Sequence, residues 1–150
     1  MSDRDTVKAV IAEVGTILEA DAALVALFAN DGGAGSLRYH YVWAPPNCEF
    51  PYLTADAKVR PERTEDGYQE IDLRMDIWTC DSSADGLFSI RAQIIALLER
   101  RVIEATEFKG RVKFDGDFDL SQPEAEVWRR STSWTVRLYP NAEIAAIKAR

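Results

Sequence analysis

The segment between residues 50 and 100 limits the possible folds of this chain most strongly. Over residues 71–77, apolar and charged side chains alternate one by one. This period of two predicts a strand that buries one face and exposes the other. From Ala84 onwards the apolar residues follow the period of a helix instead, at Leu87, Ile90, Ile94, Leu97 and Leu98. A half-buried strand followed by an amphipathic helix predicts a sheet that the helix covers.

Length and composition are those of one soluble globular domain, which we expect to span residues 1–150. A chain of 150 residues is long enough to bury roughly two thirds of its unfolded surface, and its hydrophobic fraction of 47% suits one core. No apolar run approaches the ~18 residues of a membrane helix. The first residues are charged where a signal peptide would be apolar. We therefore expect the protein in the cytoplasm in which it is made, without contact with a membrane.

The charge balance argues against a nucleic-acid-binding protein. The 25 acidic residues outnumber the 18 basic ones, which gives a net charge of -7 and a pI near 4.8. Such a surface repels a phosphate backbone, although it suits a protein past which DNA slides without sticking. The two cysteines, Cys48 and Cys80, form no Cys-x-x-Cys pair and are expected to be free thiols.

Periodicity along the rest of the chain predicts an α+β fold. The sequence predicts a first helix of two pieces over residues 3–29, with a bend or restart at Gly15 and Asp21. The predicted strands are 37–43, 52–59, 68–79, 111–115 and 126–139, with a second main helix over 84–103 and a last short helix after Asn141. We expect an antiparallel sheet of four to five strands with two main helices packed on one face. The order is helix, three strands, helix, two strands and the short terminal helix.

Motifs that carry chemistry are scarce. His40 is the one histidine and lies within a predicted strand, which argues against a zinc site or a histidine-activated nucleophile. The glycine-rich segment 30–36 follows a helix and precedes a strand, the reverse of the order in a phosphate-binding loop, and is predicted to be a plain loop. Spacing alone does not decide whether two of the many carboxylates form a catalytic pair. We expect no catalytic residue, no cofactor and no metal.

The acidic segment 115–126 matches a calcium-binding loop only in part. Acidic residues stand at positions 1, 3, 5 and 12 of such a loop. The sixth position, which requires glycine for a sharp turn, is Leu120, and Pro123 occupies the ninth. The segment is therefore predicted to be an acidic connection between two strands.

Four features together resemble a known family. They are the Phe50-Pro51-Tyr52 start of a strand, the alternating strand 71–78, the helix 86–99 and the closing strand 128–136. In this order they resemble the tail terminator proteins, also called tail completion or head–tail joining proteins, of long-tailed bacteriophages and related gene transfer agents. The resemblance covers most of the chain and rests on the pattern of elements rather than on catalytic residues.

The resemblance implies a structural virion protein and not an enzyme. Such a protein forms a ring, usually of six copies, which sits on the end of the tail tube, stops its polymerisation and offers a surface to the head connector. The implied partners are further copies of the chain, the tail tube protein and a head-proximal connector or neck protein, while DNA passes without specific binding. The implied location is the host cytoplasm during assembly and then the head–tail junction of the virion.

Candidate interface residues lie in two places. The charged connection 60–67 is expected either to be solvated or to form an arm that touches a neighbouring subunit, and a charge reversal in it is expected to leave the fold intact. The candidates in this arm are Arg60, Glu62, Arg63, Glu65 and Asp66. Tyr41 and Trp43, beside two prolines, either anchor a neighbour or are buried in the core. In a closed ring, the edge strands next to the arm would pair with the next subunit.

Two alternative functions remain. One is a small α+β enzyme or ligand-binding domain with an acidic cleft, for which the 25 acidic residues leave room. The other is a different neck or tube protein of the same particle. Oligomerisation distinguishes the first alternative from a ring-forming protein, and the phenotype of a gene deletion distinguishes the second.

Overall fold

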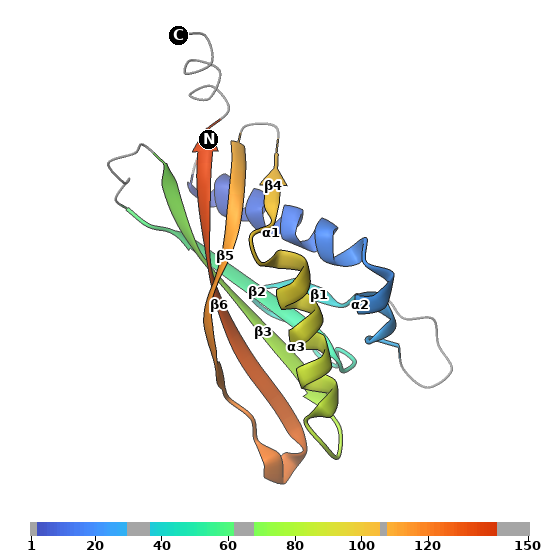
Figure 1. Cartoon of the computed structure of the whole chain (residues 1–150). Coiled ribbons are helices and arrows are strands. Elements are labelled where there is room, and N and C mark those ends of the chain that lie inside the picture. The colour runs from blue at the N-terminus through green and yellow to red at the C-terminus, as the bar shows by residue number, and fades with distance from the viewer. Residues whose placement is uncertain (1–2, 30–36, 62–67, 106–107, 141–150) are drawn as a thin grey trace, which may run out of the picture.

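The computed structural model describes residues 3–29, 37–61, 68–105 and 108–140. They form one curled six-stranded sheet with three α-helices, all of which lie on one side of the sheet (Figure 1). This is the predicted α+β arrangement, with the helices gathered on one face. In the part of the chain that the structure describes, no helix has the length and apolar character that crossing a membrane requires.

The elements are short at the edges of the sheet and long at its centre. The helices are α1 (Asp3–Glu19), α2 (Ala22–Ala26) and α3 (Asp85–Leu98), and a 3-10 turn, η1, spans Pro123–Ala125. The strands are β1 (Tyr39–Tyr41), β2 (Tyr52–Val59), β3 (Gln69–Cys80), β4 (Val102–Glu104), β5 (Phe108–Asp119) and β6 (Val127–Pro140). The predicted bounds of β2 and the two pieces of the first helix are confirmed. The loop 30–36, residues 62–67 of the arm and the helix after Asn141 fall outside the described residues.

The sheet runs in the order β1-β2-β3-β6-β5-β4. Its centre is the antiparallel pair β3–β6, in which Gln69 lies opposite Leu138 and Cys80 opposite Val127. All neighbouring strands are antiparallel except β1 and β2, which are parallel. The edge strands β1 and β4 have three residues each, and such short edges offer little backbone for pairing with a foreign strand.

Two predictions about the sheet are wrong. It has six strands rather than four to five, and one pair is parallel. The additional strand, β4, lies where the sequence predicts the second helix to continue: α3 ends at Leu98, and Arg100, with a φ of 62°, turns the chain into β4. The strands that flank the 60–67 arm are β2 and β3; β3 lies inside the sheet, whereas β1 covers β2 only over residues 53–55, so residues 56–59 of β2, next to the arm, have no described strand on their outer side. Strand order depends on pairing over long distances, which hydrophobic periodicity does not record.

The core lies between the helices and the central strands. On α1, apolar residues three or four positions apart form one buried stripe, which consists of Val7, Val10, Ile11, Val14 and Leu18. On β3, every second residue faces the helices, namely Ile71, Leu73, Met75 and Ile77, and each is at most 2% exposed. Trp134 of β6 lies opposite Leu73 and is buried with it. Burial of each such side chain stabilises the fold by about 1.5–3 kcal/mol, so apolar contact holds the two layers together.

Gly15 has a packing role rather than the predicted bend. α1 continues through it to Glu19, and the break follows at Asp21, whose carboxylate caps α2 by accepting from an amide of its first turn at 3.0 Å. The ring of Tyr39 lies against Gly15, where a Cβ would be 2.9 Å from Cε1. Tyr39 Oη also donates to the Ile11 carbonyl at 2.9 Å. Glycine is needed here because a side chain would keep β1 away from the helix.

The acidic segment 115–126 is a strand over its first part and not the predicted connection. β5 continues to Asp119, and the residues after it lead through η1 to β6. A bulge at Gly116, with a φ of 141°, shifts the register between β5 and β6. Among the described residues, no group of acidic, histidine or cysteine side chains is arranged to hold a metal ion.

The bulge places Asp117 within reach of α3. Nε of Arg130 donates to Oδ2 of Asp117 at 2.8 Å, and Arg91 of α3 donates to the same oxygen. The Asp117 side chain is 10% exposed. The hydrogen bond from Arg130, together with the one from Arg91, lowers the pKa of Asp117 to about 2, although desolvation opposes the shift. This ion pair ties α3 to the β5–β6 part of the sheet.

Replacement of Asp117 by asparagine is expected to lower the free energy of unfolding by about 2–3 kcal/mol, because two guanidinium groups lose their common anion. The pKa of Asp117 is lower in the folded chain than in the unfolded one. Its contribution is therefore fully present above the unfolded pKa of about 4 and is lost as the pH falls towards about 2. Urea unfolding of both proteins at about pH 6 and about pH 2.5 should show a smaller difference at the lower pH.

Glu124→Gln is the matched control for this change. Glu124 is exposed and forms no ion pair with a described residue, so its replacement should alter stability by less than ~0.5 kcal/mol. A difference between wild type and Asp117→Asn that is equal at both pH values would contradict the role given to Asp117.

Candidate functional site on the uncovered sheet face

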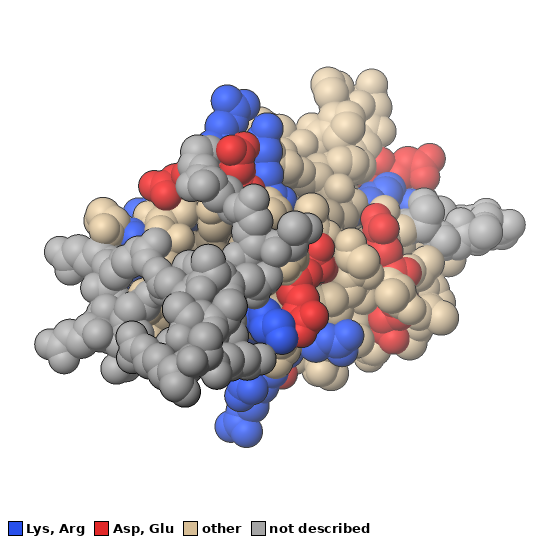
Figure 2. Space-filling model, turned by 90° about the horizontal axis from the view of Figure 1, so that it is seen from above, with Lys and Arg blue, Asp and Glu red and all other residues tan. Residues whose placement is uncertain are grey.

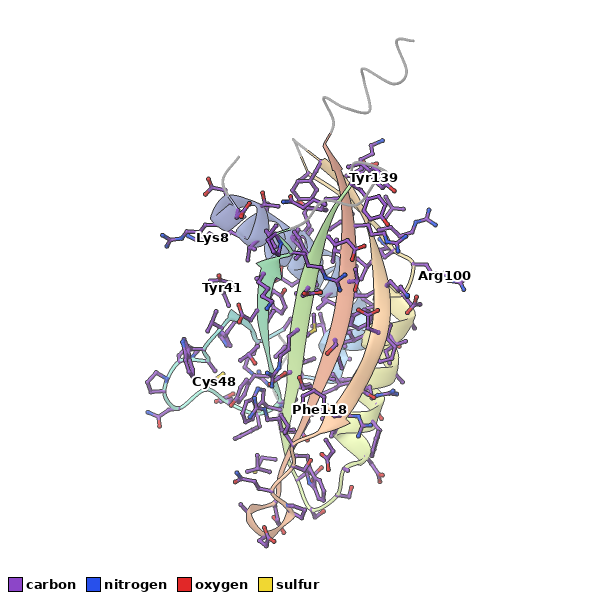
Figure 3. All side chains as sticks on the ribbon, turned by 90° about the vertical axis from the view of Figure 1, so that its left-hand side faces the viewer. Lys8, Tyr41, Cys48, Arg100, Phe118 and Tyr139 are labelled. Carbon is purple, nitrogen blue, oxygen red and sulfur yellow. The ribbon has the colours of Figure 1, made fainter. Side chains whose placement is uncertain are left out.

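The face of the sheet opposite the helices is polar, and we call it the uncovered face. Figure 3 looks onto it, with β2, β3, β6 and β5 side by side and the helices behind. Charged and hydroxyl side chains alternate with the core residues here, at Glu70, Asp72, Arg74 and Asp76 on β3 and at Arg129, Ser131, Ser133, Thr135 and Arg137 on β6. An antiparallel sheet with one packed face can present such a face to water or to a partner.

Asp76 is the most buried charged residue that the structure describes, with 5% of its surface exposed. Arg129 donates to it from Nη2 at 2.6 Å, and Arg74 donates from Nε at 3.0 Å. The Arg129 guanidinium also lies 4.2 Å from the centre of the Trp78 ring, and Trp78 stacks on Tyr52 at 5.5 Å. Two guanidinium groups replace the hydration of the carboxylate, so it is withdrawn from water without a helix above it. These five residues, Asp76, Arg74, Arg129, Trp78 and Tyr52, form a packed cluster of aromatic and charged side chains, which we call the platform.

Arg60, predicted to belong to a projecting arm, is held against the sheet. Its guanidinium donates to Glu70 and Asp72 of β3, with Nη2 2.6 Å from Oδ1 of Asp72. Glu70 is buried and also lies 3.8 Å from Nε of Arg137. The hydrogen bond to Asp72 raises the pKa of Arg60. A charge reversal at Arg60 would therefore break these ion pairs, so Arg60 is not a free side chain on a projecting loop.

A hollow of about 610 Å³ opens on the uncovered face beneath the loop of residues 42–51. The platform forms one side of it, and Trp43, which is 82% exposed, stands at its rim. Arg38 fixes the loop in place. Its guanidinium donates at 2.7–3.3 Å to the backbone carbonyls of Phe28, Glu49, Phe50 and Pro51. The chain thus holds an exposed tryptophan beside a formed hollow.

Cys48 and His40 meet beside this hollow. Sγ of Cys48 lies 3.4 Å from Nε2 of His40. Their spacing in the sequence matches no known motif, so the sequence alone does not predict this contact. A catalytic thiol requires a lowered pKa. Burial instead raises the pKa of Cys48, in spite of the nearby Arg38. The arrangement suits contact with a partner better than nucleophilic chemistry.

The structure excludes one of the two roles left open for Tyr41 and Trp43, burial in the core. They are 46% and 82% exposed, so neither belongs to the core, whereas Tyr39 packs against it. Tyr41 lies opposite Ala55 of β2, which precedes Arg60 by roughly 17 Å of strand. The two aromatic residues and Arg60 therefore lie on separate parts of the surface. The remaining candidates, Glu62, Arg63, Glu65 and Asp66, lie outside the described residues.

Sequence reasoning misses the platform for a physical reason. The alternation along β3 does place Asp76 and Trp78 on the polar face, which is a usable signal. Their partner Arg129 lies 53 residues after Asp76. It reaches them only through the register of β3 with β6, which periodicity does not reveal.

Comparison with known proteins gives a likeness of fold. A chain in the solved structure of the virion of a native gene transfer agent particle is similar with a TM-score of 0.65 and 19% sequence identity. The match covers 85% of this chain and 92% of that chain. No family model matches the sequence, and no curated protein matches it. At this level of identity, the likeness establishes a shared fold.

Cys48 is expected to react as an unactivated thiol. In the Cys80→Ser variant, which leaves Cys48 as the one cysteine, the rate of alkylation by iodoacetamide should rise with pH. Its midpoint should lie above that of the same protein unfolded in urea, because burial raises the thiol pKa. His40→Ala should leave the rate near neutral pH unchanged. A midpoint below the unfolded value, lost on removal of His40, would instead indicate a thiolate activated by the imidazole.

Proposed function

We propose that this chain is a structural protein of a phage-like virion, and specifically a tail terminator that forms a ring of six copies on the end of the tail tube. The observation that carries the proposal is the fold, which is similar over 85% of this chain to a chain of a gene transfer agent virion. Fold alone does not define a function. The surface of the molecule supplies the second line of support.

The uncovered face supports a role in assembly. It presents a polar surface next to two short edge strands, and β1 and β4 cover only residues 53–55 of β2 and 109–111 of β5, so both the face and the remaining strand edges are available to a partner. Tyr41 and Trp43 are exposed beside it, and aromatic side chains are enriched at the centres of protein interfaces. The ion pairs of Asp76 hold neighbouring side chains in place before any partner arrives. A surface ordered in this way loses less entropy on binding.

The proposed partners are further copies of the chain, the tail tube protein and a head-proximal connector or neck protein. Figure 2 looks onto the upper end of the molecule, where basic and acidic side chains lie next to one another. With a net charge of -7 per chain, a ring would not attract the phosphate backbone, and DNA would pass without specific binding. Assembly in the host cytoplasm and a final place at the head–tail junction belong to this proposal.

The two alternatives make different demands on the same surface. A small enzyme or ligand-binding domain would use the hollow, whose acidic residues are Asp56 and Asp76. These do not form a free carboxylate pair, because Asp76 is bound by Arg74 and Arg129. A protein that stays monomeric even with tail tubes present would favour this alternative. The fold supports another neck or tube protein of the same particle equally well. The phenotype of a gene deletion distinguishes that alternative from a tail terminator.

Loss of the protein is expected to give overlong or headless tails, because nothing then stops polymerisation of the tube. Electron microscopy of particles from a deletion strain measures tail length, with the complemented strain as the control. Addition of purified protein to polymerising tube protein should shorten the tubes. Tails of normal length on leaking heads would assign the chain to head closure and end the terminator proposal.

Trp43→Ala is expected to weaken ring assembly by about tenfold while leaving the melting temperature unchanged, because an indole that is 82% exposed adds little to the core. Light scattering of the purified protein measures assembly, and thermal unfolding monitors the fold. Leu27→Ala is the matched control, since this apolar side chain is 38% exposed at the end of α2. Equal assembly of wild type and Trp43→Ala would remove Trp43 from the interface.

A further inference from the structure

Six basic side chains gather along the β5 edge of the uncovered face, and we call them the cationic strip. They are Lys109, Arg111 and Lys113 on β5, Arg137 on β6, and Arg100 and Arg101 in the turn before β4. The turn lies beside β5, since the amide of Arg100 donates to the Val112 carbonyl at 2.8 Å. All six are exposed, and Figure 3 shows Arg100 pointing outwards at this edge. The strip holds six of the 18 basic residues of an acidic chain.

The described residues around the strip neutralise its charge only in part. Arg111 and Arg137 lie directly opposite each other across β5 and β6, and like charges in this position destabilise a sheet. Within the described residues, the ion pairs of the strip are those of Lys109 with Glu104 at 3.4 Å and of Arg137 with Glu70 at 3.8 Å. An excess of positive charge therefore remains on an exposed sheet face, which favours an anionic partner.

Five acidic residues gather at the opposite end of the molecule, and we call them the acidic end. They are Asp81 and Asp85 between β3 and the first turn of α3, Asp119 at the end of β5, and Glu124 and Glu126 before β6. This is the lower end in Figure 1. The Asp81 amide donates to the Glu126 carbonyl at 3.2 Å, which joins the two connections. All five are exposed. Asp119 lies opposite Arg130, and hydrogen bonds from Ser121, with a smaller contribution from the charge of Arg130, lower the pKa of Asp119.

The arginines nearest to the acidic end balance it only in part. Arg129 is bound to Asp76 and Arg130 to Asp117, both of which lie further along the sheet. Among the described residues, the acidic end therefore carries an excess of negative charge, and the strip carries an excess of positive charge.

Both surfaces also carry exposed apolar side chains. Val102, opposite Arg111 in the register of β4 with β5, is 46% exposed. Leu120, next to Asp119, is 37% exposed. Protein interfaces combine apolar and charged groups in this way, whereas phosphate contacts are made by charged and polar groups. The apolar residues therefore favour a protein as the occupant of the strip.

We propose that the acidic end of one copy docks on the cationic strip of the next copy. The inference rests on the ring proposed above and names its subunit contact. The two surfaces have opposite charge, neither is fully neutralised by the described residues of its own chain, and each adds an apolar side chain. They lie at opposite ends of the molecule, so the contact links copies head to tail and closes into a ring if the rotation between copies permits. Docking also relieves the repulsion between Arg111 and Arg137.

A charge-swap experiment on the purified full-length chain tests this contact. The strip variant carries Arg111→Glu and Lys113→Glu, and the end variant carries Glu124→Lys and Glu126→Lys. Each variant alone is expected to associate at least about tenfold more weakly than the wild type in sedimentation velocity, because like charges then meet. An equimolar mixture of the two should restore association, because every strip then finds an end of opposite charge. Added salt should weaken association of the wild type.

Arg4→Glu with Lys8→Glu is the matched control for the strip variant. Both residues are exposed on α1, and Figure 3 shows Lys8 on the side of the molecule away from the strip. This variant changes the net charge by the same amount and should associate like the wild type. Circular dichroism and thermal unfolding monitor the fold of every variant. Arg111→Gln with Lys113→Gln is a milder strip variant that should show a smaller loss in the same direction.

Three results would overturn the proposal. The first is a wild-type protein that stays monomeric at high concentration, and the second is a mixture that associates as weakly as its components. The third is a strip variant that associates normally but no longer binds a fluorescein-labelled DNA duplex, which would assign the strip to a phosphate backbone. These measurements involve no tail tube. If the protein associates head to tail but leaves tube length unchanged, the subunit contact stands and the terminator role fails. If the protein stays monomeric but still shortens tubes, the terminator role stands and the subunit contact fails.

Discussion

The antiparallel pairing of β3 with β6 determines which side chains of the central strands face the core and which lie on the uncovered face. The register sets Leu73 opposite Trp134 on the helix side and Asp76 opposite Ser131 on the uncovered face. Because successive side chains point to opposite faces, a slip of one strand by one residue would put its charged residues into the core and its apolar residues into water. Burial of the apolar set against α1 and α3 holds the register. The charged network on the other face takes its geometry from the same pairing.

The uncovered face is ordered by charge and not by a second layer of helices. Asp76 and Glu70 are only 5% and 8% exposed, and each is bound by two arginines, Asp76 by Arg74 and Arg129 and Glu70 by Arg60 and Arg137. Removal of one partner from such a cluster leaves a desolvated charge, which makes its members depend on each other. This suits a protein whose surfaces must be formed before its partners arrive, since little rearrangement is then required on binding.

Charge and exposed aromatic side chains divide the surface into separate parts. The cationic strip and the acidic end lie at opposite ends of the sheet, while Trp43 and the hollow lie beside β2. A contact between copies through the strip and the acidic end would leave the hollow free for a different virion protein. The short edge strands β1 and β4 take no part in this scheme.

Local patterns in the chain were enough to predict the bounds of β2, the alternation along β3, the apolar stripe of α3 and the two pieces of the first helix. Each of these depends on residues only a few positions apart. The parallel pairing of β1, the existence of β4, the contact of Cys48 with His40 and the exposure of Trp43 came only from the folded chain. They depend on strands that are distant in sequence and on turns such as that at Arg100, with its positive φ. Hydrophobic spacing records which face of an element is buried, and it contains no information about which element lies next to it.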